Sequence, residues 1–188
     1  MKTEEIQPTD TLEWFAIKSR QANKAEEVLN EYCDEVFFPQ EVIRTKDRAE
    51  RRRALIPRVL FVKTSRKKVL ELERRSRENP ESFIPFWIYR YPTDRKIQVI
   101  SPRSIELLRL LTSGDTTQCE IFNKTDFREN ERVRVTGGPY QGYEGFVQRV
   151  KKNKHVIVKL EGICLIMLPF IHPDLLEPVE TQNLSVDD

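Results

Sequence analysis

The pattern of apolar residues changes about two thirds of the way along this 188-residue chain. Before that point, strand-like runs alternate with helical stretches. After a polar, aperiodic stretch, the apolar residues fall in short runs rich in Val and Ile. Such a switch in pattern indicates two domains. We expect domains at 1–112 and 128–180, a linker at 113–127 and a tail at 181–188.

The first domain is expected to be an α+β structure, an antiparallel sheet with flanking helices. Ser65 precedes an amphipathic stretch that runs to about Arg77, and Ser101 with Pro102 forms a typical helix start. A third helix is predicted at 23–33, where apolar residues recur at helical spacing. Extended segments are predicted at 12–18, 36–43, 59–62, 83–91 and 97–100.

The second domain contains short runs of β-branched and apolar residues separated by turn residues. Such runs occur at 133–135, 146–150, 156–160 and 163–168. About 50 residues of this kind favour a small β-barrel.

Composition excludes several classes of protein. The three cysteines are far apart, with no CxxC pair and no even disulfide set, which indicates a reducing, cytoplasmic compartment. Two histidines without paired cysteines argue against a zinc site, and no cofactor is expected. No apolar run reaches the length of a membrane helix, and the polar N-terminus is unlike a signal peptide.

Positive charge is concentrated in one segment. Residues 44–77 carry 14 basic and four acidic side chains, whereas the whole chain has a net charge of +2. The centre of this segment, 44–53, lacks apolar periodicity and is predicted to be an exposed loop. Its basic residues could contact nucleic-acid phosphates, or the loop could be a solvated partner of the acidic 1–43 segment. These candidates are Arg44, Lys46, Arg48, Arg51, Arg52 and Arg53.

Catalytic motifs are missing. The sequence has no G-x-S-x-G elbow, no P-loop and no G-x-G-x-x-G run. Neither His155 nor His172 has a neighbouring nucleophile in the sequence. We therefore expect a binding protein, not an enzyme.

A glycine-rich turn lies between two strand-like runs near residue 140. The segment 132–147, RVRVTGGPYQGYEGFV, resembles the KOW motif, which implies a small barrel that binds RNA or protein. A hairpin with convenient glycines is the simpler alternative. Tyr140 and Tyr143 could be partner contacts or could cap the end of the barrel. The motif residues are Gly137, Gly138, Pro139, Tyr140, Gly142, Tyr143 and Gly145.

The N-terminal half adds a second resemblance. Trp14-Phe15-Ala16-Ile17 followed by a helix, and then residues 56–62 (IPRVLFV), resemble the N-terminal domain of NusG-family transcription factors. The NusG order of N-terminal domain, linker and KOW domain would cover about residues 12–178. The chain departs from the family at Arg58, where glycine is usual, and at Val59, where an aromatic residue is usual.

The resemblance implies binding to the clamp helices of RNA polymerase, which disfavours pausing. It also implies that the KOW domain recruits a partner such as Rho or a small ribosomal protein. The protein is expected to be a monomer that does not bind a membrane. The candidates carried over for the polymerase face are Trp14, Phe15, Pro57, Phe61 and Val62. Each could instead belong to the core, and Phe61 and Val62 must point to opposite faces of a strand.

The two departures, the basic 44–53 loop and the aromatic 83–91 segment make the chain look like the specialised UpxY-type paralogues, which antiterminate surface-polysaccharide operons. A housekeeping NusG elongation factor is the nearest alternative. A ribosome-associated KOW protein is a more distant one.

Overall fold

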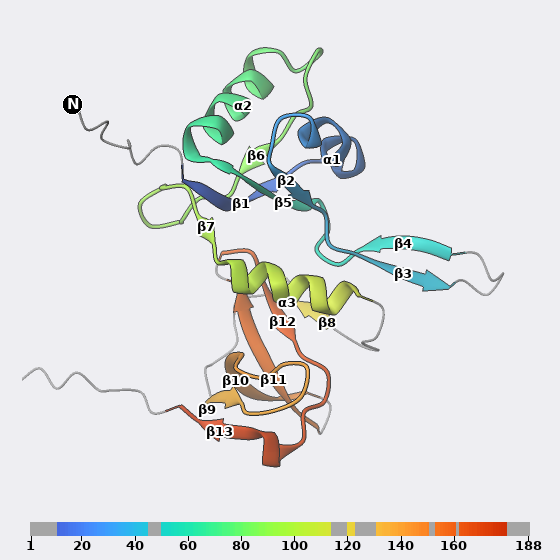
Figure 1. Ribbon diagram of the computed structural model, residues 1–188, viewed down its shortest axis with the longest axis vertical. Coiled ribbons are helices and arrows are strands. Elements are labelled where there is room, and N and C mark those ends of the chain that lie inside the picture. The colour runs from blue at the N-terminus through green and yellow to red at the C-terminus, as the bar shows by residue number, and fades with distance from the viewer. Residues whose placement is uncertain are drawn as a thin grey trace, which may run out of the picture. The chain divides into compact units, whose positions relative to one another are not determined.

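The computed structural model describes residues 11–44, 50–113, 120–122, 131–150, 153–160 and 162–179. The chain divides into two compact units, with the division between Ser113 and Gly114 (Figure 1). We call them the N-terminal unit and the C-terminal unit, and each is described by itself. The predicted tail, 181–188, lies outside the described residues.

The N-terminal unit is built on a five-stranded antiparallel sheet. Its order is β2-β5-β1-β6, and β7 also pairs with β1. The central pair, β1 and β5, is in register from Leu12 opposite Ser65 to Lys18 opposite Val59. The predicted first strand is confirmed, and the predicted 59–62 strand extends to Ser65. The strands are β1 (Leu12–Lys18), β2 (Glu35–Phe37), β5 (Val59–Ser65), β6 (Trp87–Ile88) and β7 (Val99–Ile100).

Three helices accompany the sheet: α1 (Ala22–Asn30), α2 (Arg66–Glu78) and α3 (Pro102–Thr112). Ser65 and Ser101 cap α2 and α3, since their hydroxyl oxygens accept the N–H groups of residues three positions on, at 3.3 and 3.2 Å. Helix α1 ends three residues before its predicted limit. The N–H groups of Tyr32 and Cys33 both bond to the Leu29 carbonyl, because the chain turns there to enter β2.

Both faces of this sheet are covered. Phe15, Leu60 and Val62 face the core shared with α1 and α2. On the other face, the guanidinium of Arg109 in α3 lies 5.9 Å from the ring centre of Trp14 and 4.9 Å from that of Phe37. Figure 1 shows α3 on the side of the sheet opposite α1 and α2. The sheet therefore has no bare apolar face over β1 and β5.

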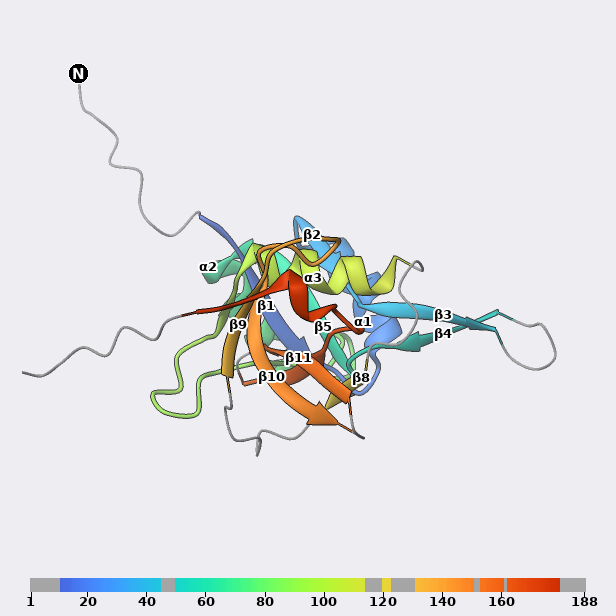
Figure 2. The ribbon, with the colours of Figure 1, turned by 90° about the horizontal axis from the view of Figure 1, so that it is seen from below.

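A separate hairpin leaves this unit. Strands β3 (Gln40–Arg44) and β4 (Glu50–Ala54) pair in antiparallel register, with Arg44 opposite Glu50 and Gln40 opposite Ala54. We call this hairpin the arm; it projects away from the sheet in both views (Figures 1 and 2). The prediction of a loop at 44–53 was wrong for Glu50–Arg53. Periodicity gave no strand signal because residues 50–53 are exposed on both faces.

The C-terminal unit is a six-stranded antiparallel sheet of order β13-β9-β10-β11-β12-β8. Strand β8 lies within the predicted linker and pairs with β12 through three residues. The predicted closed barrel is not found: in the described residues the strand order is an open path, with no pairing between its ends, β13 and β8. The elements are β8 (Glu120–Phe122), β9 (Glu131–Val135), β10 (Glu144–Val150), β11 (Asn153–Leu160), β12 (Cys164–Met167), a 3-10 turn (Pro173–Leu175) and β13 (Leu176–Pro178).

Candidate nucleic-acid interface

Three consecutive arginines on β4 give the arm its positive charge. Arg51, Arg52 and Arg53 are all exposed, and side chains alternate along a strand, so Arg52 points to the face opposite the other two. Arg53 is held by Glu41 of β3, whose Oε1 accepts its Nε–H at 2.6 Å. Among the described residues, no ion pair is found for Arg51 or Arg52. Two guanidinium groups are therefore available for phosphate on opposite faces of the arm.

Part of the predicted basic cluster lies outside the described residues. Lys46 and Arg48 fall in the 45–49 segment, and Arg44 is placed by its backbone in β3, opposite Glu50. The structure thus brings Arg51, Arg52 and Arg53 into one strand. Their contact with nucleic acid stays a prediction.

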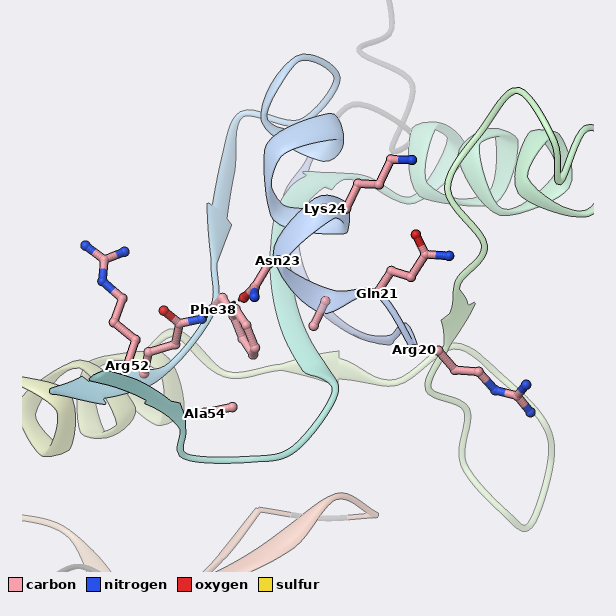
Figure 3. A pocket seen from close by; sticks show the side chains of 9 residues that line it. Arg20, Gln21, Asn23, Lys24, Phe38, Arg52 and Ala54 are labelled. Carbon is pink, nitrogen blue, oxygen red and sulfur yellow. Dashed lines mark hydrogen bonds between the residues drawn. The ribbon is translucent and has the colours of Figure 1, made fainter. Parts of the chain in front are cut away.

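The base of the arm adjoins the start of helix α1. A hydrogen bond of 3.1 Å from Gln40 Nε2 to Asn23 Oδ1 joins the two elements. Beside it lies an open cavity of about 420 Å³, with Phe38 in its wall and Arg20, Lys24 and Arg52 at its rim. Figure 3 shows the charged ends of these three side chains pointing outward, away from the cavity. This spread of charge suits an extended polyanion better than a small enclosed anion.

The sequence interpretation missed Arg20 and Lys24 as neighbours of the arm. Burial raises the pKa of Glu26 in α1, and the charge of Arg52 in β4 opposes that rise. In the sequence, the signal for this site was that Arg20 and Lys24 flank the start of a helix. Their separation from Arg52 by about 30 residues hid the relationship.

The five candidates for the polymerase face do not form a surface patch. Trp14, Phe15, Phe61 and Val62 are buried, whereas Pro57 is exposed. Phe61 and Val62 do point to opposite faces, but each face is covered, so neither is exposed. The burial supports a core role for these four residues.

Pro57 precedes a strained turn. Arg58 adopts a φ of +66°, a conformation that glycine reaches at much lower cost. This is the position at which the NusG-like pattern usually has glycine. The Arg58 carbonyl accepts the Ser19 N–H at 3.0 Å, which ties the turn to the end of β1. The departure from the pattern therefore changes the side chain and keeps a glycine-like backbone.

The KOW-like segment forms the connection from β9 to β10. Gly138 and Gly142 have φ values of +77° and +81°, and the Gly142 N–H bonds to the Val135 carbonyl at 2.6 Å. At Gly145, an added Cβ would collide with the Ile157 carbonyl of β11. These glycines thus serve backbone conformation and strand approach. Gly137 is half-buried and Pro139 is exposed.

The two tyrosines of this segment differ in exposure. Tyr140 is buried, which favours the packing interpretation over partner contact, whereas Tyr143 is half-buried.

Close by, an ionic network crosses β9, β10 and β13. Arg134 donates to Glu144 at 2.7 Å and to Glu177 at 3.4 Å, and Arg132 donates to Glu144 at 3.0 Å. The hydrogen bond from Arg134, together with the charges of Arg134 and Arg132 and the bond from Arg132, outweighs burial and lowers the pKa of Glu144.

Other site types find no support in the described part of the chain. It contains no group of three or more His, Cys, Asp or Glu side chains arranged to hold a metal ion. None of its helices is long and apolar enough to cross a bilayer.

Comparison with known proteins supports a relationship to NusG proteins. No protein-family model matches the chain. The transcription termination/antitermination protein NusG of Borreliella burgdorferi is 32% identical over 66 residues, which are 34% of this chain and 36% of that protein. The chain therefore matches about a third of the length of this curated relative. A crystal structure of an MjSpt4:Spt5 complex in conformation B has 18% identity and a TM-score of 0.29, covering 89% of this chain and 97% of that one.

Proposed function

We propose that this protein is a NusG-like transcription elongation factor that binds RNA polymerase and contacts nucleic acid through its arm. The observation that carries the proposal is the exposed triplet Arg51–Arg53 on a hairpin outside the main sheet. Its support from outside the structure is the similarity to NusG over 66 residues. The protein acts by binding, without catalytic chemistry, in the cytoplasm.

The arm supplies affinity and orientation. Arginines that contact phosphates release counterions and position a protein on nucleic acid without reading its sequence. Because Arg51 and Arg52 point to opposite faces, the arm can lie between two nucleic-acid strands or across one groove of a duplex. Placed at the upstream DNA or the exposed non-template strand, it would hold the factor on the elongation complex.

The partners in this proposal are divided between the units. The N-terminal unit binds the clamp helices of RNA polymerase, with Pro57 as the exposed member of the candidate set. The C-terminal unit recruits a second protein, such as Rho or a small ribosomal protein. In its finer form, the proposal is operon-specific antitermination of the UpxY type, with suppression of pausing.

The test is affinity purification of the tagged full-length chain from its source cells, followed by transcription in vitro with the purified polymerase. We expect polymerase subunits in the eluate and shorter pauses when the protein is added. Recovery of ribosomal particles instead, with unchanged pausing, would contradict the proposal and favour a ribosome-associated role. Readthrough of one operon and not of others would separate the specialised role from a housekeeping one.

A further inference from the structure

Trp87 is an exposed tryptophan in the two-residue strand β6, with 48% of its surface accessible. The other tryptophan of the chain, Trp14, is buried. Large aromatic side chains at a surface cost hydrophobic free energy and mark binding sites more often than other residues do. Trp87 belongs neither to the arm nor to the KOW-like segment, so the roles given to these two do not explain its exposure.

The frame around Trp87 is rigid. The N–H groups of Phe86 and Ile88, on either side, donate to Ser76 Oγ at 3.0 Å and to Glu73 Oε1 at 2.9 Å. Both acceptors are buried side chains of α2. Ser19 Oγ also donates to the Pro85 carbonyl at 2.8 Å. These bonds hold the backbone on both sides of an exposed ring, which lowers the entropy lost on binding.

Two exposed basic residues lie on the β1 side of Trp87 in the sheet, Lys18 in the neighbouring strand and Arg58 immediately before the strand beyond it. Lys18 of β1 is exposed and lies directly opposite Trp87 in the strand register, so both side chains project from the same face of the sheet. Val59 lies on the other side of Lys18 in this row, and the neighbouring row contains Ala16 and Phe61. Lys18 is the ionic residue among these. Arg58, also exposed, precedes Val59 in the turn bonded to Ser19.

We propose that Trp87, Lys18 and Arg58 form a site for single-stranded nucleic acid, in which an unpaired base stacks on the indole ring. The two cations contact successive phosphates on one side of that base. An exposed stacking ring with cations on one side suits an unpaired base because every base has a π-face, whereas bases in a duplex are already stacked. A protein segment could also cover a tryptophan, but the positive charge of Lys18 and Arg58 beside it favours a polyanion. The site goes beyond the proposed function and requires no polymerase.

The test measures binding of a labelled 15-nucleotide oligothymidine, and of its oligouridine counterpart, to the purified full-length chain by fluorescence anisotropy. We expect Trp87→Ala to weaken binding about tenfold, in line with a stacking contribution of about 1–3 kcal/mol per base. Trp87→Phe should recover part of the loss, and Lys18→Ala should lower the salt dependence. Leu70→Ala, which removes another exposed apolar side chain, is the matched control and should leave affinity unchanged.

A second measurement reports on the ring itself. In a Trp14→Phe background, Trp87 is the only tryptophan, and its fluorescence should be quenched by the single strand. A blunt duplex or an abasic strand of equal length should quench it much less. Equal quenching by the abasic strand, or unchanged affinity of Trp87→Ala, would overturn the site. If Trp87→Ala loses polymerase binding but keeps its oligonucleotide affinity, the nucleic-acid site is also overturned, in favour of a protein contact at Trp87. That result would leave the proposed transcription role standing.

Discussion

Glu73 of helix α2 accepts the backbone N–H of Ile88 at 2.9 Å, from a side chain that is only 1% exposed. The same carboxylate accepts hydrogen bonds from the guanidinium groups of Arg90 at 2.6 Å and Arg77 at 2.8 Å. A buried carboxylate is costly unless it is paired and hydrogen-bonded, and here every partner is present. The relationship fixes β6, and with it the exposed ring of Trp87, to the second helix.

Removing this carboxylate should destabilise the N-terminal unit. We expect Glu73→Ala to lower the free energy of unfolding by about 3 kcal/mol, because the Ile88 N–H and the Arg90 guanidinium both lose their acceptor. Urea denaturation followed by circular dichroism measures the change. Glu78→Ala is the control: its contact with Arg74 is 3.9 Å long and exposed, so stability should change by less than about 0.5 kcal/mol. Equal effects of the two variants would contradict this assignment.

The same residue predicts a pH dependence. Burial by itself would raise the pKa of Glu73, but the bonds from Arg90 and Ile88 and the charges of Arg90 and Arg77 outweigh it and hold the pKa below its ordinary value of 4.5. Its stabilising contribution is therefore complete above pH 4.5 and is lost as the pH falls through the lowered folded-state pKa. Glu73→Gln should flatten this acid limb. Unfolding measured from pH 7 down to pH 3 in both proteins tests the slope, and parallel curves would count against it.

The arm predicts a salt effect. Replacing Arg51, Arg52 and Arg53 by Ala should weaken DNA or RNA binding and reduce the log–log salt slope by up to about 1.8, at about 0.9 for each phosphate contact made by Arg51 and Arg52. Melting temperature should change little, since the one ion pair lost, Arg53 with Glu41, is exposed. Affinity titrations at several salt concentrations measure the slope.

A matched control removes three exposed charges from another surface, by changing Arg66, Lys67 and Arg74 of α2 to Ala. It should reduce the slope less than the arm variant. If the arm instead serves to balance the acidic 1–43 segment, the arm variant will lose thermal stability with unchanged binding and antitermination.

The glycines of the KOW-like connection should differ in their tolerance of a methyl group. Gly145→Ala places a Cβ against the Ile157 carbonyl and 2.9 Å from Val156 Cγ1, so it should separate β10 from β11 and cost more than about 2 kcal/mol. Gly138→Ala has open space but a φ of +77°, so it should cost about 1 kcal/mol. Thermal unfolding of the full chain ranks them. The reverse order would show that backbone conformation outweighs strand approach here.

Strand β8 predicts where the C-terminal unit can be shortened. A fragment that begins at residue 120 keeps the pairing of Ile121 with Ile166, whereas one that begins at 123 exposes the edge of β12. We expect the longer fragment to be more stable and less prone to aggregation. Proteolysis rates and size-exclusion chromatography of the two fragments compare them. Equal behaviour would mean that β8 contributes nothing to the unit.

Much of the fold could be predicted from the local chemistry of the sequence. Ser101 with Pro102 marks a helix start wherever it occurs, and a strand such as β1 keeps its apolar run because both of its faces are buried. The turn glycines could also be recognised in the sequence, since the freedom to adopt a positive φ is a property of glycine itself. Such features depend on neighbours within a few positions of the chain.

Tertiary structure alone decided the remainder. Arg51–Arg53 form a strand because β3 lies beside them, β8 exists because β12 offers an edge, and Trp87 is exposed because Glu73 and Ser76 fix its flanking residues. The sequence likewise contained no sign that α3 covers Trp14 and Phe37, on the sheet face that also holds the predicted polymerase contact Phe61. Each of these outcomes depends on a partner distant in the chain. Pairing and burial are properties of the assembled fold, and a single residue's chemistry does not contain them.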